Sequence, residues 1–193
     1  MKLLPSLGAA VALMLASALP AAAQVESGTW TSYAPTFSVQ ERGCGDVNNL
    51  TFTLTCSTSS GDQRAERRYA TYSSGTRQFQ GFFRITSQTG TRISLKQTFH
   101  GGAYFMLAVE RGGRLYAVHG GDTIATGATV GTTVRVNTVH VVGGEHRTYI
   151  NGSRKHTVDS EGGDFYDKFG AYRTNSGAGP ITVVWSDIRF WRK

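Results

Sequence analysis

The chain has 193 residues, among them 24 glycines and 4 prolines, and its formal net charge is +7. This length is enough for one domain with a sizeable hydrophobic core and too little for two. The positive charge favours anionic partners, but a dense patch of Lys and Arg with interleaved aromatic residues is missing, which counts against a nucleic-acid-binding protein.

Residues 1–23 are typical of a secretory signal peptide. Lys2 gives a positive start, the stretch from Leu3 to Leu19 is mostly apolar, and small residues precede an expected cleavage after Ala23. The apolar stretch is too short and too weakly flanked for a membrane anchor, and no other run approaches spanning length. We therefore expect a secreted protein, extracellular or periplasmic, whose residues 24–193 form a single domain with no membrane segment.

The two cysteines, Cys44 and Cys56, follow the predicted signal peptide and have no other possible partner within the chain. In an exported protein such a pair forms a disulfide. Because the loop between them is short, we expect a structural bridge that staples an N-terminal hairpin, rather than a reactive or metal-binding thiol.

The rest of the chain alternates short β-rich runs with turns that contain glycine, and helical periodicity is absent. Asn151-Gly152 is the strongest hairpin signal. The pattern predicts an all-β protein whose two antiparallel sheets pack as a β-sandwich or β-jelly roll. The runs rich in Val, Ile, Thr and aromatic residues are 50–56, 77–85, 92–99, 104–110, 114–119, 132–142, 147–150 and 181–191.

Several familiar motifs of catalysis and binding are missing. The five histidines and two cysteines show neither His-x-His nor Cys-x-x-Cys spacing, so a preformed zinc site is not expected. The Gly-Gly pairs separate strands instead of preceding a helix, so they are turns and not phosphate loops. Neither a Gly-x-Ser-x-Gly elbow nor a strand with the paired acids of a glycoside hydrolase is present. We expect neither metal nor cofactor.

One stripe of polar side chains lies near the C-terminus. If residues 166–172 form a strand, Tyr166, Lys168, Gly170 and Tyr172 point to the same face, because side chains alternate along a strand. The opposite face, with Phe169 and Ala171, would pack into the core. The stripe is either the floor of a binding groove, with Gly170 leaving room for a sugar ring, or an ordinary exposed face.

A second stripe lies in the segment RAERR. Arg64, Glu66 and Arg68 share one face of the expected strand. Arginine binds carboxylates through two parallel hydrogen bonds, and a glutamate between two arginines can hold them in place. Taken alone, this stripe is more typical of a solvated edge strand with a weak ladder of ion pairs.

The two stripes together resemble a known family. The jelly-roll polysaccharide lyases of the alginate lyase type, which include glucuronan lyases and plant relatives described as citrate-binding proteins, carry Arg-(Ser/Thr)-Glu-(Leu/Val)-Arg and Tyr-Phe-Lys-(Ala/Cys)-Gly-(Val/Ile)-Tyr strands. Residues 64–68 and 166–172 are similar to these motifs, and the resemblance extends over roughly 64–191. It implies a concanavalin A-like sandwich. Arg67 departs from it, since a Leu or Val that points into the core is expected there.

The resemblance implies β-elimination on a uronic-acid polymer. This reaction needs a neutralised carboxylate, a base for the C5 proton and an acid for the leaving oxygen. Tyr172 maps onto the family's central tyrosine and would serve as base and acid, with its pKa lowered by nearby cations. The cations of both stripes, together with Tyr166, would bind the substrate: Arg64, Arg68 and Lys168.

A third family motif, Gln-x-His, is only partly present. It falls on Gln97-Thr98-Phe99, so Phe99 stands where a histidine is expected, and His100 follows one residue later. Strict alternation puts Gln97 and His100 on opposite faces unless a bulge intervenes near the following Gly-Gly pair. We therefore keep Gln97 and His100 as assisting residues, with His140 as another candidate histidine.

The resulting hypothesis is a secreted, cofactor-independent polysaccharide lyase that cleaves an anionic polyuronate, glucuronan-like or alginate-like, and acts as a monomer. The alternative is a non-catalytic protein that binds an acidic glycan or a polycarboxylate through the same groove.

Overall fold

The computed structural model describes residues 24–57, 62–173, 177 and 179–193, so the predicted signal peptide lies outside the described residues. The described residues form strands and no helix, and none of them belongs to a helix that could cross a membrane. The strands of the larger sheet are β1 (Thr31–Tyr33), β3 (Gly45–Asn48), β4 (Thr51–Leu54), β6 (Thr76–Gln88), β11 (Thr133–Val141), β12 (Glu145–Ile150), β13 (Ser153–Asp159) and β15 (Ile181–Arg192). Those of the smaller sheet are β2 (Phe37–Arg42), β5 (Arg64–Tyr69), β7 (Arg92–His100), β8 (Gly102–Glu110), β9 (Leu115–Ala117), β10 (Thr123–Ala125) and β14 (Tyr166–Tyr172).

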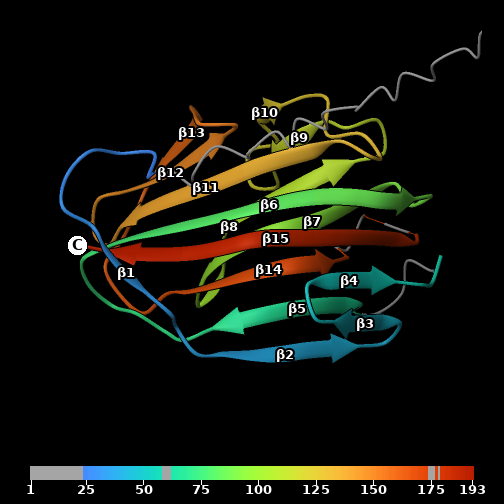
Figure 1. Cartoon of the computed structure of the whole chain (residues 1–193), viewed down its shortest axis with the longest axis horizontal. Helices are drawn as coiled ribbons and strands as arrows, with labels where there is room; N and C mark the ends of the chain where they lie inside the picture. Colours follow the sequence, from blue (N-terminus) through green and yellow to red (C-terminus); the bar gives the residue numbers. More distant parts are fainter. Residues whose placement is uncertain (1–23, 58–61, 174–176, 178) are drawn as a thin grey trace, which may run out of the picture.

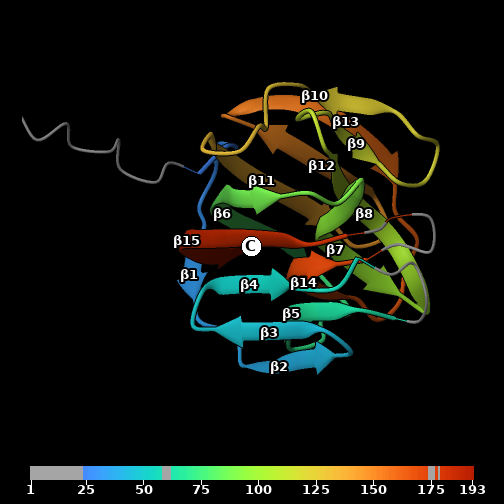
Figure 2. The same cartoon turned by 90° about the vertical axis from the view of Figure 1, so that its right-hand side faces the viewer.

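Two antiparallel sheets pack face to face, which confirms the predicted β-sandwich. The order of the larger sheet is β13-β12-β11-β6-β15-β4-β3, with β1 on β15, and that of the smaller sheet is β10-β9-β8-β7-β14-β5-β2. The long strands β6 and β15 run the length of the molecule (Figure 1). The view turned by 90° shows the strands of the smaller sheet, β14 and β7 among them, beside the larger sheet (Figure 2).

The strand β14 shows how alternation builds the core. Phe169 and Ala171 are fully buried between the sheets, and the Phe169 ring lies 5.0 Å from that of Trp185 and 5.5 Å from that of Phe52. Burying an aromatic side chain of this size stabilises the fold by about 2–3 kcal/mol. The predicted inward face of this strand is therefore confirmed, and its other face is left for a site.

Gly170 is needed for close backbone packing and not, as its position in the sequence predicts, to leave room for a sugar ring. A Cβ atom there would lie 2.2 Å from the Ala65 carbonyl oxygen and 2.8 Å from Phe52, and the φ angle is +144°. Glycine is required because the backbone of β5 and a core ring approach this position closely. The expected space for a sugar ring at Gly170 is thus already occupied by the protein.

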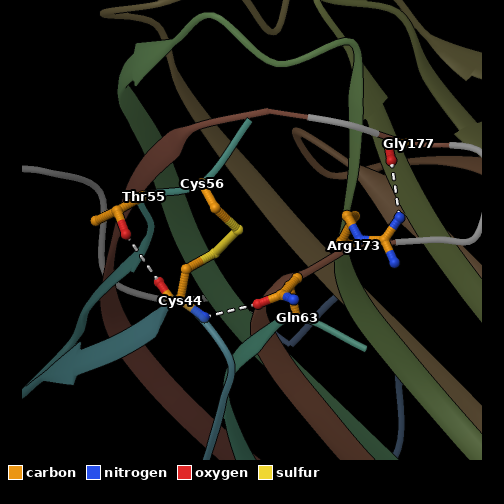
Figure 3. The surroundings of a disulfide bond; sticks show 6 residues. All are labelled: Cys44, Thr55, Cys56, Gln63, Arg173 and Gly177. Atoms are coloured by element: carbon orange, nitrogen blue, oxygen red, sulfur yellow. Dashed lines mark hydrogen bonds between the residues drawn. A yellow bond between two sulfur atoms is a disulfide. The ribbon is translucent and has the colours of Figure 1, made fainter. Parts of the chain in front are cut away.

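The predicted disulfide is present. Cys44 and Cys56 flank the β3–β4 hairpin, and their bond closes it (Figure 3). The Cys44 N–H donates to Oε1 of Gln63 at 2.6 Å, which ties the stapled hairpin to the start of β5. The predicted Asn151-Gly152 turn joins β12 to β13, with φ angles of 51° and 85° that suit a hairpin turn.

Candidate functional site

Three neighbouring strands of the smaller sheet bring the predicted residues together. Lys168 on β14 lies opposite Arg68 of β5 on one side and Gln97 of β7 on the other, and Tyr172 lies opposite Arg64. Their shared outer face is hollowed into a pocket of about 210 Å³, called the groove pocket below. Its lining residues are Gln40, Arg64, Gln97, Phe99, Ala103, Met106, Tyr166, Lys168 and Tyr172.

The floor of the groove pocket is a hydrogen-bonded triad. The Gln97 amide donates to Oε1 of Glu66 at 2.5 Å, and the Lys168 Nζ lies 3.5 Å from Oε2 of the same carboxylate. Glu66 is 1% exposed and Lys168 is 5% exposed. Burial raises the pKa of Glu66 and lowers that of Lys168, because it disfavours both charges, although the pairing opposes each shift. Lys168 is therefore a buried, partnered cation, in contrast to the exposed charge that the sequence suggests.

Besides Lys168, two cations lie at or beside the groove pocket: Arg64 lines it, and Arg68 contacts the lining residue Tyr166. The Arg68 guanidinium lies 4.1 Å from the centre of the Tyr166 ring, a cation–π contact. Arg64 lies 5.2 Å from the Tyr172 ring. The Nε atoms of both arginines are buried and have no hydrogen-bond partner among the described residues. The positive field of the site therefore comes mainly from these two side chains.

Tyr172 is held protonated in its present surroundings. Its hydroxyl donates to Oδ1 of Asp62 at 3.4 Å. Burial raises the pKa of Tyr172, the negative charge of Asp62 raises it further, and Arg64 opposes both effects. The cations in the sequence predict a lowered pKa for Tyr172, and the net shift is in the opposite direction. Tyr172 is thus ready to donate a proton, and more alkaline conditions are needed before it can accept one.

The other side of the groove pocket is apolar. The rings of Phe99 and Tyr166 stack at 4.9 Å with an angle of 19° between their planes, and Ala103 and Met106 of β8 complete this wall. Lys168 Nζ lies 5.5 Å from the centre of the Phe99 ring. Phe99 occupies the position where the resemblance places a histidine, and none of the residues that line the pocket is a histidine.

The two candidate histidines lie elsewhere. His100 shares a hydrogen bond of 2.9 Å with the backbone oxygen of Asp164, and its ring stacks on Phe165 at 4.4 Å. The pairing of β7 with β8 is irregular beside Phe99, because Thr98 pairs with Phe105 and Phe99 pairs with Ala103. The additional residue of this bulge, Tyr104, is on β8, so the bulge does not turn His100 of β7 toward the groove pocket. His140 is on β11 of the larger sheet and is 1% exposed. The structure therefore brings Gln97 to Tyr172 and neither histidine.

The position of Arg67 on β5 faces the core, but its side chain turns away to the edge of the sandwich. Its guanidinium donates to the Asn49 carbonyl at 2.7 Å and lies 4.3 Å from the centre of the Phe37 ring, at the edge of the sandwich. Because β5 is followed in the sheet only by β2, an arginine can reach solvent here.

Two residues of the site were not predicted from the sequence. Gln40 reaches the groove pocket from β2, where it lies opposite Glu66, and within the described part of the chain its buried side-chain oxygen has no hydrogen-bond partner. Asp62 precedes β5 and contacts Tyr172 and Arg64. The polar alternation of β2 could have marked Gln40 as outward-facing, whereas no sequence signal marks Asp62.

Comparisons with known proteins find likeness in structure only. No family model and no curated protein matches the chain. Among solved structures, the alginate lyase AlgAT5 of polysaccharide lyase family 7 has a TM-score of 0.60 at 21% identity, with 78% of this chain and 83% of that chain covered. An alginate lyase from a Corynebacterium species has a TM-score of 0.59 at 20% identity, covering 76% and 79%. One from Pseudomonas aeruginosa has a TM-score of 0.58 at 16% identity, covering 80% and 88%. At this level of identity, the chain shares the jelly-roll fold of alginate lyases.

Proposed function

We propose that this protein is a secreted polysaccharide lyase that cleaves an anionic polyuronate, glucuronan-like or alginate-like, by β-elimination. The observation that carries the proposal is the convergence of Arg64, Gln97 and Tyr172 from three strands on one pocket. The structural likeness to proteins named alginate lyases supports it at the level of the fold. Export is supported by the sequence of residues 1–23 and by a disulfide, a bond that persists in oxidising compartments.

The chemistry assigns one residue to both proton transfers. Arg64 and the second amide hydrogen of Gln97 neutralise the uronate carboxylate, which makes the C5 proton more acidic. The Tyr172 oxygen, as phenolate, takes this proton, the C5–H electrons form the C4=C5 double bond, and the C4–O bond breaks. The same Tyr172 hydroxyl then returns the proton to the leaving oxygen. His100 has no part in this scheme, because it lies away from the pocket.

A single proton-transferring residue restricts the geometry of the substrate. It can reach the C5 hydrogen and the C4 oxygen only when both lie on the same side of the sugar ring. They do so in β-D-mannuronate and β-D-glucuronate, and they lie on opposite sides in α-L-guluronate. We therefore expect polymannuronate or glucuronan to be cleaved in preference to polyguluronate.

The test follows the double bond directly. The protein is incubated with polymannuronate, polyguluronate and glucuronan, and the ultraviolet absorbance of the conjugated product is recorded. Tyr172→Phe should lower kcat by about 10²–10⁴-fold, since it removes the acid–base group, and leave substrate binding close to wild type. Tyr166→Phe, which keeps the stacked ring of the same pocket, is the matched control and should retain activity. Absence of product with all three polymers would contradict the lyase assignment.

A second function, non-catalytic binding of an acidic glycan or polycarboxylate, is favoured by two observations. Phe99 stands in place of a histidine, and the pKa of Tyr172 is raised. If the protein is such a binder, polyuronates bind without forming a double bond, and Tyr172→Phe changes the affinity little.

A further inference from the structure

The carboxylate of Asp62 lies at one end of the groove pocket and contacts two cations. Oδ2 lies 3.1 Å from Arg42 Nη1 and 3.2 Å from Arg64 Nη2, while Oδ1 accepts the hydrogen bond of Tyr172. An aspartate side chain and a uronate carry the same planar carboxylate, and both fit the fork of an arginine. Asp62 thus occupies a position suited to a carboxylate of the substrate.

We propose that Asp62 is a resident competitor of the polymer: it occupies Arg42 and Arg64 in the free protein, and a uronate carboxylate must displace it to bind. This inference rests on the proposed function, since it assumes that the ligand carries uronate carboxylates. It makes Asp62 a residue that sets affinity and selectivity. A polymer that offers several neighbouring carboxylates can replace Asp62, whereas a single weak anion cannot.

The ion pairs of Asp62 can break because their side chains are partly exposed to solvent. The Asp62 side chain is 37% exposed and that of Arg42 is 66% exposed. Ion pairs at such exposed positions contribute about 0–1 kcal/mol, so a ligand can exchange for one at little cost. The pair at the floor of the same pocket differs, because Lys168 and Glu66 have side chains only 6% and 2% exposed. Of these two pairs, the one at the rim is the one that can open.

The negative charge of Asp62 also acts on Tyr172 in the free protein. The charged groups that face it are Asp62, Arg64 and Glu66 from β5 and the segment before it, and Lys168 from β14, while β7 contributes the neutral Ser94 and Gln97. In the free protein, replacement of Asp62 by a neutral residue leaves Arg64 uncompensated, which favours the phenolate of Tyr172. A purely structural role of Asp62 would not affect this ionisation.

The experiment compares Asp62→Asn with Asp122→Asn in the full secreted chain. Asp122, whose side chain is 73% exposed and which lies outside the groove pocket, loses the same charge and serves as the matched control. Binding of short oligomannuronates and oligoglucuronates is measured by calorimetry at low salt. Asp62→Asn should bind about two- to fivefold more tightly than wild type, in keeping with the contribution of an exposed ion pair. Asp122→Asn should bind like wild type, and Asp62→Glu, which keeps the carboxylate, should stay close to wild type.

A second measurement uses the pH dependence of kcat/KM, which reports ionisations of the free enzyme. The rise of kcat/KM with pH should move to lower pH in Asp62→Asn and stay in place in Asp122→Asn. Equal or weaker binding by Asp62→Asn, with product still formed by wild type, would overturn this inference and leave the proposed function intact. Tighter binding without any product would support the inference and reject the lyase. Absence of binding by both forms would reject both.

Discussion

Neighbouring strands of the smaller sheet carry one lysine–carboxylate pair on each face, between β7 and β14 on the inner face and between β14 and β5 on the outer face, and the surroundings of the two pairs differ. On the inner face, Lys96 pairs with Asp167 between the sheets, and the Lys96 Nζ also donates to the Gln97 carbonyl at 3.0 Å and to Thr98 Oγ1 at 3.5 Å. Across the sheets, Thr98 meets His146 at 3.0 Å. On the outer face, Lys168 pairs with Glu66 beside an open pocket.

The difference separates a structural pair from a functional one. The inner lysine has three oxygen acceptors and lies within the core, so its bonds are complete and no ligand can reach it. On the outer face, the side-chain oxygen of Gln40 is buried without a hydrogen-bond partner among the described residues. Buried polar atoms without partners cost free energy, and such a cost is retained where a ligand supplies the missing bonds. The two pairs therefore differ in access from the groove pocket and not in burial of charge.

The largest expected effect comes from breaking the inner pair. Lys96→Met leaves Asp167 buried without its cation, which should lower the free energy of unfolding by about 3–5 kcal/mol. Lys168→Met should cost less, because Glu66 keeps its bond to Gln97, lies beside a solvent-accessible pocket and has a raised pKa that favours uptake of a proton. Urea unfolding of both variants tests the comparison. Equal losses would show that the two faces do not differ in this way.

The next largest effect is a loss of folding stability in acid, which we expect to come from two buried histidines between the sheets. Burial lowers the pKa of His140 from 6.5 to about 4 and that of His146 well below its usual value. Below about pH 6.5 the unfolded chain therefore binds more protons than the folded chain. The free energy of unfolding is highest above about pH 6.5 and falls as the pH drops toward the pKa of the folded state. For His140 the loss approaches roughly 3 kcal/mol near pH 4.

Unfolding midpoints between pH 7 and pH 4 measure this loss. His140→Gln should make the stability less dependent on pH, since it removes one of the two buried imidazoles. Tyr172→Phe, a change on the outer face, should leave the slope as in wild type. A slope that His140→Gln does not alter would mean that another group causes the acid destabilisation.

The sequence predicted the parts of this molecule that depend on local pattern. Period-two alternation placed Phe169 in the core and Lys168 on the opposite face, and the spacing in RAERR placed Arg64 and Arg68 beside it. The disulfide and the Asn151-Gly152 turn were predicted for the same reason, because each depends on residues that are close in the chain.

The parts that depend on strand order and burial were not predictable. Gln40 joins the site only because β2 is the neighbour of β5 in the sheet. Lys96 sits on a face that alternation assigns to the core, and only the approach of Asp167 and Thr98 explains a lysine there. The ionisation of Tyr172 depends on burial and on Asp62, so the cations in the sequence pointed in the wrong direction.

The smallest expected effect concerns Arg68, at the rim of the outer face. Arg68→Ala removes a cation that stacks on Tyr166 and has an Nε atom without a partner, so polyuronate affinity should fall several-fold, by about 1 kcal/mol. The free energy of unfolding should change by less than about 0.5 kcal/mol, because the side chain is only partly buried and has no carboxylate within ion-pair distance among the described residues. Arg68→Lys should restore part of the affinity, since it keeps the charge and loses the planar stack.

Arg154→Ala, on an exposed position of β13 in the other sheet, removes the same charge and should leave the affinity unchanged. If both alanine variants weaken binding equally, the polymer is attracted by net charge and not by the groove; if only Arg68→Ala does so, and less steeply at high salt, the rim of the outer face binds the carboxylates.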